Sequence, residues 1–120
     1  MISLLLVILA IVLSVILYPI GFIYALVTFK LRLKDYYYAI AYSIDQLGNV
    51  VMSAMFNRLL IEEDSQYKFG NPDWTISAVL GGNLLTMRLR PLGLWLVEIL
   101  DSIDDNHCVN AFNNEIKKLK

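Results

Sequence analysis

The chain has 120 residues, 58% of them hydrophobic, and its 10 Lys and Arg nearly balance its 11 Asp and Glu, for a formal net charge of −1. A charge so close to zero argues against a general phosphate-binding surface, and we expect no nucleic-acid partner. The single cysteine excludes an intramolecular disulfide and is consistent with a reducing compartment.

The N-terminal segment differs in composition from the rest of the chain. Residues 2–29 contain no acidic or basic residue and no His, Asn or Gln. A helix of this length, at about 1.5 Å per residue, would reach roughly 42 Å and so exceed a hydrocarbon core of about 30 Å. A cleaved signal peptide would carry basic residues before a short apolar run, whereas no charged side chain precedes Lys30. We predict a retained transmembrane anchor over residues 1–29, rather than a signal peptide or the buried helix of a soluble core.

Basic residues directly after the span predict its orientation. Lys30, Arg32 and Lys34 follow the span, and only the α-amino group precedes it. By the positive-inside rule, we predict that residues 30–120 form a small domain on the cytoplasmic side of the membrane. Amphipathic aromatic residues suit the headgroup zone, and the predicted membrane-interface set is Lys30, Arg32, Lys34, Tyr36, Tyr37, Tyr38, Trp74 and Trp95.

The next segment, residues 35–61, has the spacing of a single helix with two stripes. The apolar stripe consists of Ile40, Ile44, Leu47, Val51, Met55 and Leu59 or Leu60, and the opposite, uncharged polar stripe consists of Tyr42, Gln46, Asn49, Ser53 and Asn57. So thin a polar stripe favours a helix that packs on the rest of the domain, on a second copy or on the membrane surface. An alternative is that Gln46 and Asn49 hydrogen-bond the equivalent helix of an oligomer.

A polar loop follows and leads into a second helical segment. Glu62, Glu63 and Asp64 are adjacent and lack partner ligands at a recognisable spacing, which favours a solvated acidic turn over a metal site. Asn71 is the predicted N-cap of the next helix, with Pro72 at its first position and Asp73 beside the positive end of its dipole. Within that helix the Gly81–Gly82 pair indicates either a bend or a close backbone approach, and it lacks the Lys and Ser or Thr of a phosphate loop.

Residues 92–103, which follow Pro91, are predicted to form a buried or interfacial helix. A second membrane span over residues 74–103 would place Arg88 and Arg90 near its middle. Each arginine there would cost roughly 2.5 to 3.5 kcal/mol, which disfavours that span. Trp74 and Trp95 would then suit a domain that lies against the bilayer.

Candidate chemical groups gather only near the C-terminus, where the chain contains Asp101, Asp104, Asp105, His107 and Cys108. Asp101 and Asp104 could flank a cation or orient His107. A structural role is favoured, because Asp105 or Asn106 is a good N-cap for a final helix. The apolar residues of that helix are Val109, Phe112, Ile116 and Leu119. One His beside one Cys is far from a zinc quartet, and we expect no metal and no cofactor.

The chain contains three short motifs in a characteristic order. They are IDQLGN at 44–49, GNPDWTIS at 70–77 and LDSIDDNHCVNAF at 100–112. In this order the chain resembles small uncharacterised proteins of tailed phages and proteobacterial prophages with the pattern D-Q-x-x-N, G-[ND]-P-D-x-T-I-S and H-C-x-x-A. The matching positions are Asp45, Gln46, Asn49, Gly70, Pro72, Asp73, Thr75, Ser77, His107, Cys108 and Ala111. The chain departs from the pattern at Trp74, where a carboxylate is common, and at residues 78–82, where the pattern usually contains Arg. The resemblance implies a phage or prophage origin, and with it a location in a bacterial inner membrane or a virion membrane, and it implies no particular activity.

If the motifs meet in space, their polar groups would form one constellation. Its members would be Asp45, Gln46, Asn49, Asp73, Thr75, Ser77, His107 and Cys108. Such a set supplies complementary donors and acceptors, and we interpret it first as a device that holds the fold together and second as a binding site.

The sequence thus predicts an all-α protein, with one transmembrane helix followed by a small helical domain. We expect a non-enzymatic structural or interaction role as a virion membrane component or a host-membrane factor. Its partners would be the lipid bilayer and either a second copy or another membrane or virion protein, with no small-molecule substrate. Two alternatives remain open, namely a lysis or membrane-permeability factor of the holin or antiholin type, and a hydrolase that uses His107 with Asp104 or Asp105.

Overall fold

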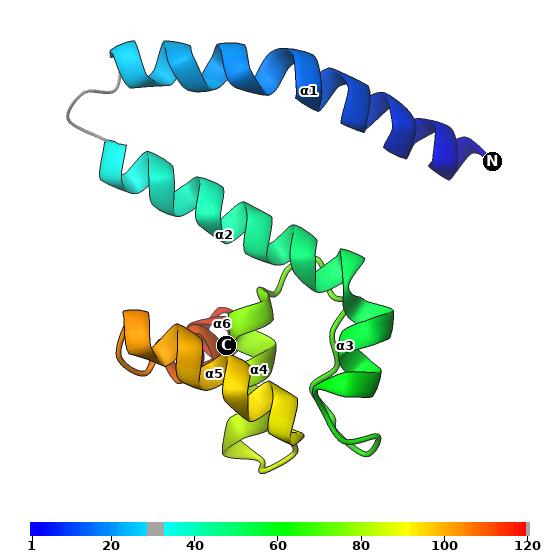
Figure 1. Cartoon of the computed structure of the whole chain (residues 1–120), viewed down its shortest axis with the longest axis vertical. Coiled ribbons are helices and arrows are strands. Elements are labelled where there is room, and N and C mark those ends of the chain that lie inside the picture. The colour runs from blue at the N-terminus through cyan, green and yellow to red at the C-terminus, as the bar shows by residue number, and fades with distance from the viewer. Residues whose placement is uncertain (29–32, 120) are drawn as a thin grey trace. The chain divides into compact units, whose positions relative to one another are not determined.

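The computed structural model describes residues 1–28 and 33–119, which form six α-helices (Figure 1). These are α1 (Ile2–Thr28), α2 (Leu33–Val51), α3 (Ser53–Leu59), α4 (Ile76–Leu85), α5 (Pro91–Ile103) and α6 (His107–Lys118). The predicted all-α fold is confirmed. The chain divides into two compact units, Met1–Tyr38 and Ala39–Lys120, and the boundary between them falls inside α2. Lys30 and Arg32, predicted at the membrane interface, lie outside the described residues.

The apolar segment forms one continuous helix, α1, as predicted. Pro19 lies inside it without ending it, and Ala25 is its buried residue. The hydroxyls of Ser14 and Thr28 donate to the carbonyls four residues earlier, at 2.6 and 3.0 Å, so the helix satisfies its own polar groups. Among the described residues α1 is the one helix that is long and apolar enough to cross a membrane, and its apolar window is not buried by the rest of the protein.

The segment predicted as a single helix over residues 35–61 is divided in two. α2 ends at Val51 and α3 begins at Ser53, and the chain changes direction there (Figure 1). The Ser53 hydroxyl donates to the carbonyl of Val50 at 2.8 Å, in competition with the helix ladder. Sequence periodicity did not reveal this break, because Ser53 and Met52 are both compatible with a helix.

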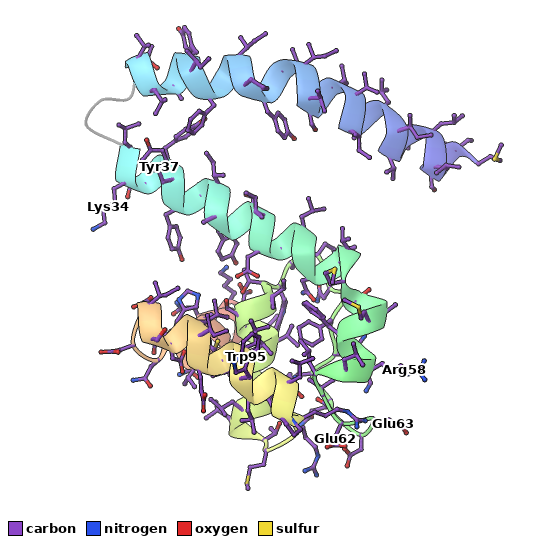
Figure 2. All side chains as sticks on the ribbon, viewed as in Figure 1. Lys34, Tyr37, Arg58, Glu62, Glu63 and Trp95 are labelled. Atoms are coloured by element: carbon purple, nitrogen blue, oxygen red, sulfur yellow. The ribbon has the colours of Figure 1, made fainter. Side chains whose placement is uncertain are left out.

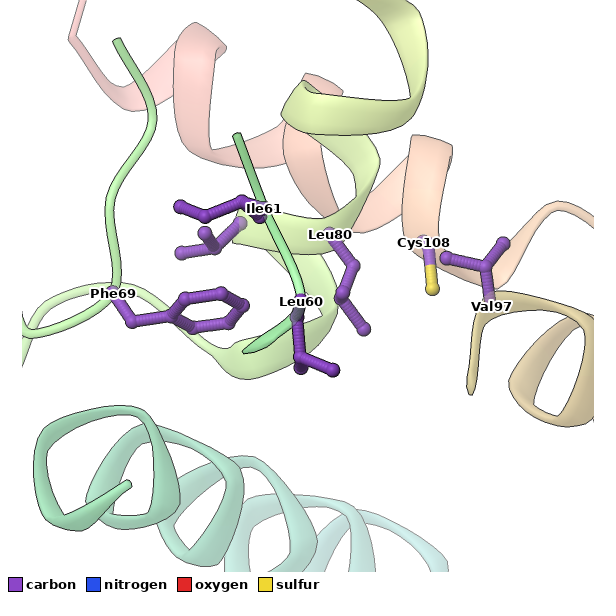
Figure 3. Close-up of a cluster of buried hydrophobic side chains, with 7 residues drawn as sticks. Leu60, Ile61, Phe69, Leu80, Val97 and Cys108 are labelled. Atoms are coloured by element: carbon purple, nitrogen blue, oxygen red, sulfur yellow. The ribbon is translucent and has the colours of Figure 1, made fainter. Parts of the chain in front are cut away.

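The second unit is built around α4, which packs mainly against α6, while α5 contacts both. The buried apolar cluster draws Leu60, Ile61 and Phe69 from the segment after α3, Val79 and Leu80 from α4, Val97 from α5 and Cys108 from α6 (Figure 3). Residues 60–62 also pair with the segment before α5, since the N–H of Glu62 donates to the carbonyl of Arg88 and the N–H of Arg90 to the carbonyl of Leu60, both at 2.8 Å. These two backbone hydrogen bonds join the segment after α3 to the segment before α5 and close the core.

The Gly81–Gly82 pair allows α6 to approach α4 closely, and it does not bend α4. α4 runs through both glycines without interruption. A Cβ atom at Gly81 would overlap the carbonyl of Cys108, and one at Gly82 would lie 2.8 Å from the Phe112 ring. The two glycines therefore let the backbone of α6 lie directly against α4.

The predicted start of this helix was wrong. α4 is capped by Thr75, whose hydroxyl accepts from the N–H of Ala78 at 3.0 Å. Asn71 instead accepts the N–H of Asp73 at 2.9 Å and forms a turn two residues long. A proline after an asparagine fits both structures, so the motif alone could not separate them.

α5 and α6 begin close to where the sequence predicts. Pro91 occupies the first turn of α5, and Asn106 precedes α6 with a left-handed φ of 57°. α5 is half buried: Gly93 and Val97 face the core, whereas Trp95 is 58% exposed. The predicted buried or interfacial helix is thus buried on one side and apolar on the other.

Candidate functional site

The polar stripe of α2 and α3 faces the interior of the second unit. Asn49 is fully buried, and its amide donates to the carbonyls of Asn71 and Trp74 at 2.9 and 2.8 Å. The Asn49 side-chain oxygen accepts from the N–H of Gly70 at 2.9 Å. One side chain thus fixes both ends of the turn that precedes α4.

Two further amides of the stripe act in the same way. Gln46 donates to the carbonyl of Asp73 at 3.1 Å. Asn57 bonds both backbone groups of Phe69, at 3.0 and 2.7 Å. The amide NH2 group of Gln46 and both polar groups of Asn49 therefore make bonds within their own chain.

Asp45 supplies the negative charge at the start of α4. Its carboxylate accepts from the N–H of Ile76 at 2.7 Å and from the hydroxyl of Ser77 at 3.0 Å. An anion at the N-terminus of a helix stabilises the helix dipole and satisfies an N–H that has no partner within the helix. Asp45 is thus a capping residue provided by a different helix.

The network continues from Ser77 to the C-terminal motif. The Nε2 atom of His107 lies 3.1 Å from the Ser77 hydroxyl, and its Nδ1 atom lies 3.1 Å from the carboxylate of Asp104. The Ser77 hydroxyl donates to Asp45 and can accept from His107, and the donor and acceptor roles of the two His107 nitrogens depend on its tautomer. We call Asp45, Ser77, His107 and Asp104, with the amides of Gln46, Asn49 and Asn57, the polar network.

The order hydroxyl, imidazole and carboxylate is that of a nucleophilic hydrolase, but the surroundings of the hydroxyl do not suit one. Ser77 is only 3% exposed, and its hydroxyl is shared with Asp45. The N–H groups of Ile76 and Ala78, which could otherwise stabilise an oxyanion, already bond Asp45 and Thr75. The arrangement is suited to holding α2, α4 and α6 together.

The remaining predicted members enter the site in different ways. Asp73 contributes its backbone, through the bonds to Gln46 and Asn71, while its side chain faces solvent.

The N–H of Cys108 donates to Asp101 at 3.3 Å. Burial, followed by the charges of Asp101 and Asp45, raises the pKa of the Cys108 thiol to about 12. The thiol is therefore protonated at neutral pH and is neither a nucleophile nor a ready metal ligand.

A second polar contact joins α2 to α6, and the sequence did not reveal it. Tyr42 donates to the buried carboxylate of Glu115, and Lys118 bonds both groups, at 2.9 Å to Tyr42 and 3.2 Å to Glu115. Burial and the Glu115 hydrogen bond raise the pKa of Tyr42, and the bonds to Tyr42 and Glu115 raise the pKa of Lys118. Glu115 lies three residues after Phe112, which is the available signal that it faces inward.

The acidic turn is solvent-exposed, as predicted, and is paired with arginines. Asp64 lies 3.2 Å from Arg88, and Glu62 lies 3.8 Å from Arg90. Figure 2 shows Glu62 and Glu63 in the loop that follows α3, near Arg58 at the end of that helix. Within residues 1–28 and 33–119, no group of three or more His, Cys, Asp or Glu is placed to hold a metal ion.

The two predicted interfacial tryptophans have different surroundings. The ring of Trp74 stacks on Tyr67, with centroids 6.2 Å apart, and meets Phe112 edge-on. Trp74 therefore takes part in the packing of the second unit, where it is half buried. Trp95 is exposed on α5 (Figure 2). At the start of α2, Lys34 is exposed, and Tyr36 and Tyr37 pack on Phe22 of α1 at 6.2 and 6.3 Å between centroids.

The apolar stripe of α2 and α3 faces outward. Its exposed members are Ile44 (63%), Leu47 (62%), Val51 (67%), Met55 (47%) and Leu59 (45%). We call these five residues the outer apolar face. A helix that directs its polar side inward and its apolar side outward reverses the usual arrangement of a soluble domain, and such surfaces mark contact with a protein or a membrane.

Comparison of the chain with models of protein families, with curated proteins and with solved structures found no match.

Proposed function

We propose that this chain is a membrane-anchored, non-enzymatic protein whose helical domain has a structural or interaction role at the bilayer surface. The observation that carries the proposal is α1, an uncharged helix of 27 residues whose apolar side chains are exposed along its length. About 20 such residues suffice to cross a bilayer. The resemblance to phage and prophage proteins supports a virion membrane component or a host-membrane factor. Lys30, Arg32 and Lys34 support a domain in the cytoplasm.

The reversed polarity of α2 and α3 supports the same proposal. A soluble domain gains stability by covering apolar side chains, yet here five of them face outward while Asn49 is fully buried. The arrangement is favourable where the outward side does not face water. The exposed face of α5, with Trp95 and Ile103, offers a separate surface for a second copy or for another membrane or virion protein.

Alkaline extraction of membranes from cells that express the full chain tests the anchor. We expect the protein to remain in the membrane pellet. The variant Leu9→Arg/Leu13→Arg should move to the soluble fraction, because each central arginine costs roughly 2.5 to 3.5 kcal/mol of insertion. The matched control is Met87→Arg/Ile103→Arg, whose positions are 83% and 81% exposed outside α1, and it should stay in the pellet. Extraction of the unmodified chain would overturn the proposal.

The alternative of a lysis factor is less well supported by α1. The hydroxyls of Ser14 and Thr28 bond the helix backbone, so these groups do not form a polar stripe that could line a pore. Induced expression in cells stained with a potential-sensitive dye separates the two functions. We expect an unchanged membrane potential, and a rapid loss of potential would favour the permeability function instead.

The alternative of a hydrolase rests on Ser77, His107 and Asp104, and burial of the hydroxyl argues against it. Under our proposal, the effect of Ser77→Ala on biological function follows its effect on stability. Retained folding with complete loss of function in Ser77→Ala, together with covalent labelling of Ser77 by a fluorophosphonate, would establish the hydrolase.

A further inference from the structure

The outer apolar face of α2 and α3 is an exposed surface to which the proposed anchor assigns no role. The exposed positions from residue 39 to residue 55 are all uncharged, and Ser43 is the one polar residue among them. The polar groups on the opposite side of these helices already bond the chain itself. The face is therefore suited to a partner that offers apolar contact and requires few hydrogen bonds.

Basic residues lie at the end of this face that is nearer to α1 in the sequence. Lys34 is exposed in the first turn of α2 beside Asp35, and Lys30 and Arg32 precede it in the sequence. At the other end, the exposed Arg58 is followed by Glu62 and Glu63, so that end is not basic. An apolar strip next to a basic cluster is the pattern of a helix in the plane of a membrane that contains anionic lipids. Charge complementarity thus favours a lipid surface over a neutral protein surface.

The chain also limits how far α2 can be from the bilayer. α1 ends at Thr28 and α2 begins at Leu33, so five residue steps separate them. At about 3.5 Å for each fully extended residue, these steps span at most about 18 Å. With α1 in the membrane, the start of α2 lies within reach of the headgroups.

We propose that the outer apolar face of α2 and α3 is a second membrane-attachment surface, which lies in the headgroup region of a leaflet that contains anionic lipids. The inference rests on the proposed anchoring by α1 and adds a contact made by the second unit. Helices of this kind bury their apolar side by about 5 to 10 Å. The domain would then be held on the bilayer at two places.

The test uses the full chain reconstituted in vesicles of phosphatidylglycerol and phosphatidylethanolamine. Single-cysteine variants Leu47→Cys and Val51→Cys, made in a Cys108→Ala background, carry an environment-sensitive fluorophore. Asn114→Cys, on the exposed side of α6, is the matched control. We expect a blue shift and strong quenching by brominated lipid tails at 47 and 51, and neither at 114.

Two results would overturn the inference. A blue shift without quenching by brominated lipid, together with disulfide-linked dimers of Leu47→Cys, would show that a second copy covers the face. A label at 47 that is neither shifted nor quenched would show that the face is in water.

A further label separates this inference from the anchor on which it rests. Val12→Cys reports insertion of α1 in the same vesicles. Quenching at 12 without quenching at 47 and 51 refutes the second attachment and leaves the anchor intact, whereas a label at 12 that brominated lipid does not quench refutes the anchor itself. Replacing the anionic lipid with phosphatidylcholine should reduce the quenching at 47 and leave that at 12 unchanged.

Discussion

Asp45 and Asp73 both belong to the sequence motifs, but their carboxylates have different surroundings. Asp45 accepts the N–H of Ile76 and the hydroxyl of Ser77, whereas Asp73 takes part through its backbone and its carboxylate is in solvent. We expect Asp45→Ala to reduce the free energy of unfolding by about 2 to 3 kcal/mol, because it leaves two donors without their acceptor. Asp73→Ala should change it by less than about 0.5 kcal/mol.

Thermal unfolding followed by circular dichroism in detergent measures both variants. Asp45→Asn, which keeps an acceptor oxygen without the charge, should fall between wild type and Asp45→Ala. Equal effects of Asp45→Ala and Asp73→Ala would contradict the capping role of Asp45 and would favour the prediction that the Asp73 side chain belongs to the polar constellation.

Cys108 makes the free energy of unfolding depend on pH in the alkaline range. Its folded pKa is about 12, above the value of about 8.5 of a free thiol. The thiol therefore contributes stability that is fully present below about pH 8.5 and is lost as the pH rises toward the folded value. The pKa of Tyr42 is also raised in the folded protein, so its ionisation at alkaline pH lowers stability as well.

Denaturant unfolding across this range should show a smaller alkaline loss in Cys108→Ala than in wild type, and the difference isolates the thiol from Tyr42. In the native state, iodoacetamide should modify Cys108 far more slowly than the exposed cysteine of Asn113→Cys. Rapid native-state alkylation of Cys108 would contradict its burial.

At the scale of the element, Gly81 sets how closely α4 and α6 pack. A Cβ there would overlap the Cys108 carbonyl and lie 2.9 Å from the Cβ of Phe112, and both belong to α6. We expect Gly81→Ala to destabilise the second unit by about 3 kcal/mol or more, since neither backbone can move without opening the core.

Gly21→Ala in α1 is the matched control for this prediction, because a Cβ at Gly21 would meet no atom within 4 Å. Alanine also favours a helix over glycine by about 1 kcal/mol, so the control should be neutral or slightly stabilising. Near-equal melting temperatures of the two variants would show that α6 is not in close contact with Gly81.

The element boundaries show what local sequence does and does not determine. Composition alone predicts α1, and Pro91 marks the start of α5. The break at Met52 and the cap at Thr75 depend on side-chain bonds to Val50 and Ala78, which several local conformations allow. Periodicity identified both stripes of α2, but it could not say which faces inward, because periodicity does not distinguish packing on the domain from packing on a second copy or on a membrane surface.

Part of the membership of the candidate site was predictable from the sequence, and its hydrogen bonds were not. The motifs placed Asp45, Asn49, Ser77 and His107 together, and the structure joins them around the start of α4. Their partners are mostly backbone groups of residues 69–76, and a sequence carries no residue-type signal for a backbone acceptor. Glu115 was missed for a related reason, because a glutamate on a helix is usually exposed.

At the scale of the whole molecule, the basic residues after α1 predict its orientation. Lys30, Arg32 and Lys34 favour a cytoplasmic second unit. A membrane-impermeant maleimide should therefore label Asn113→Cys, on exposed α6, only after the cells are opened. Cys108 is buried and protonated, which allows the native cysteine to remain in place. Labelling in intact cells would show the reverse orientation.

The inward polar side of α2 and α3 also sets the hydrogen-exchange behaviour of the chain. The amide protons of Phe69, Gly70 and Ile76 are bonded to Asn57, Asn49 and Asp45, and none of them lies in a helical ladder that protects it independently. Release of α2 and α3 would expose all three to deuterium while the helices themselves stayed folded. These amides thus act as built-in reporters of whether the two helices are docked, and their exchange would increase together on release.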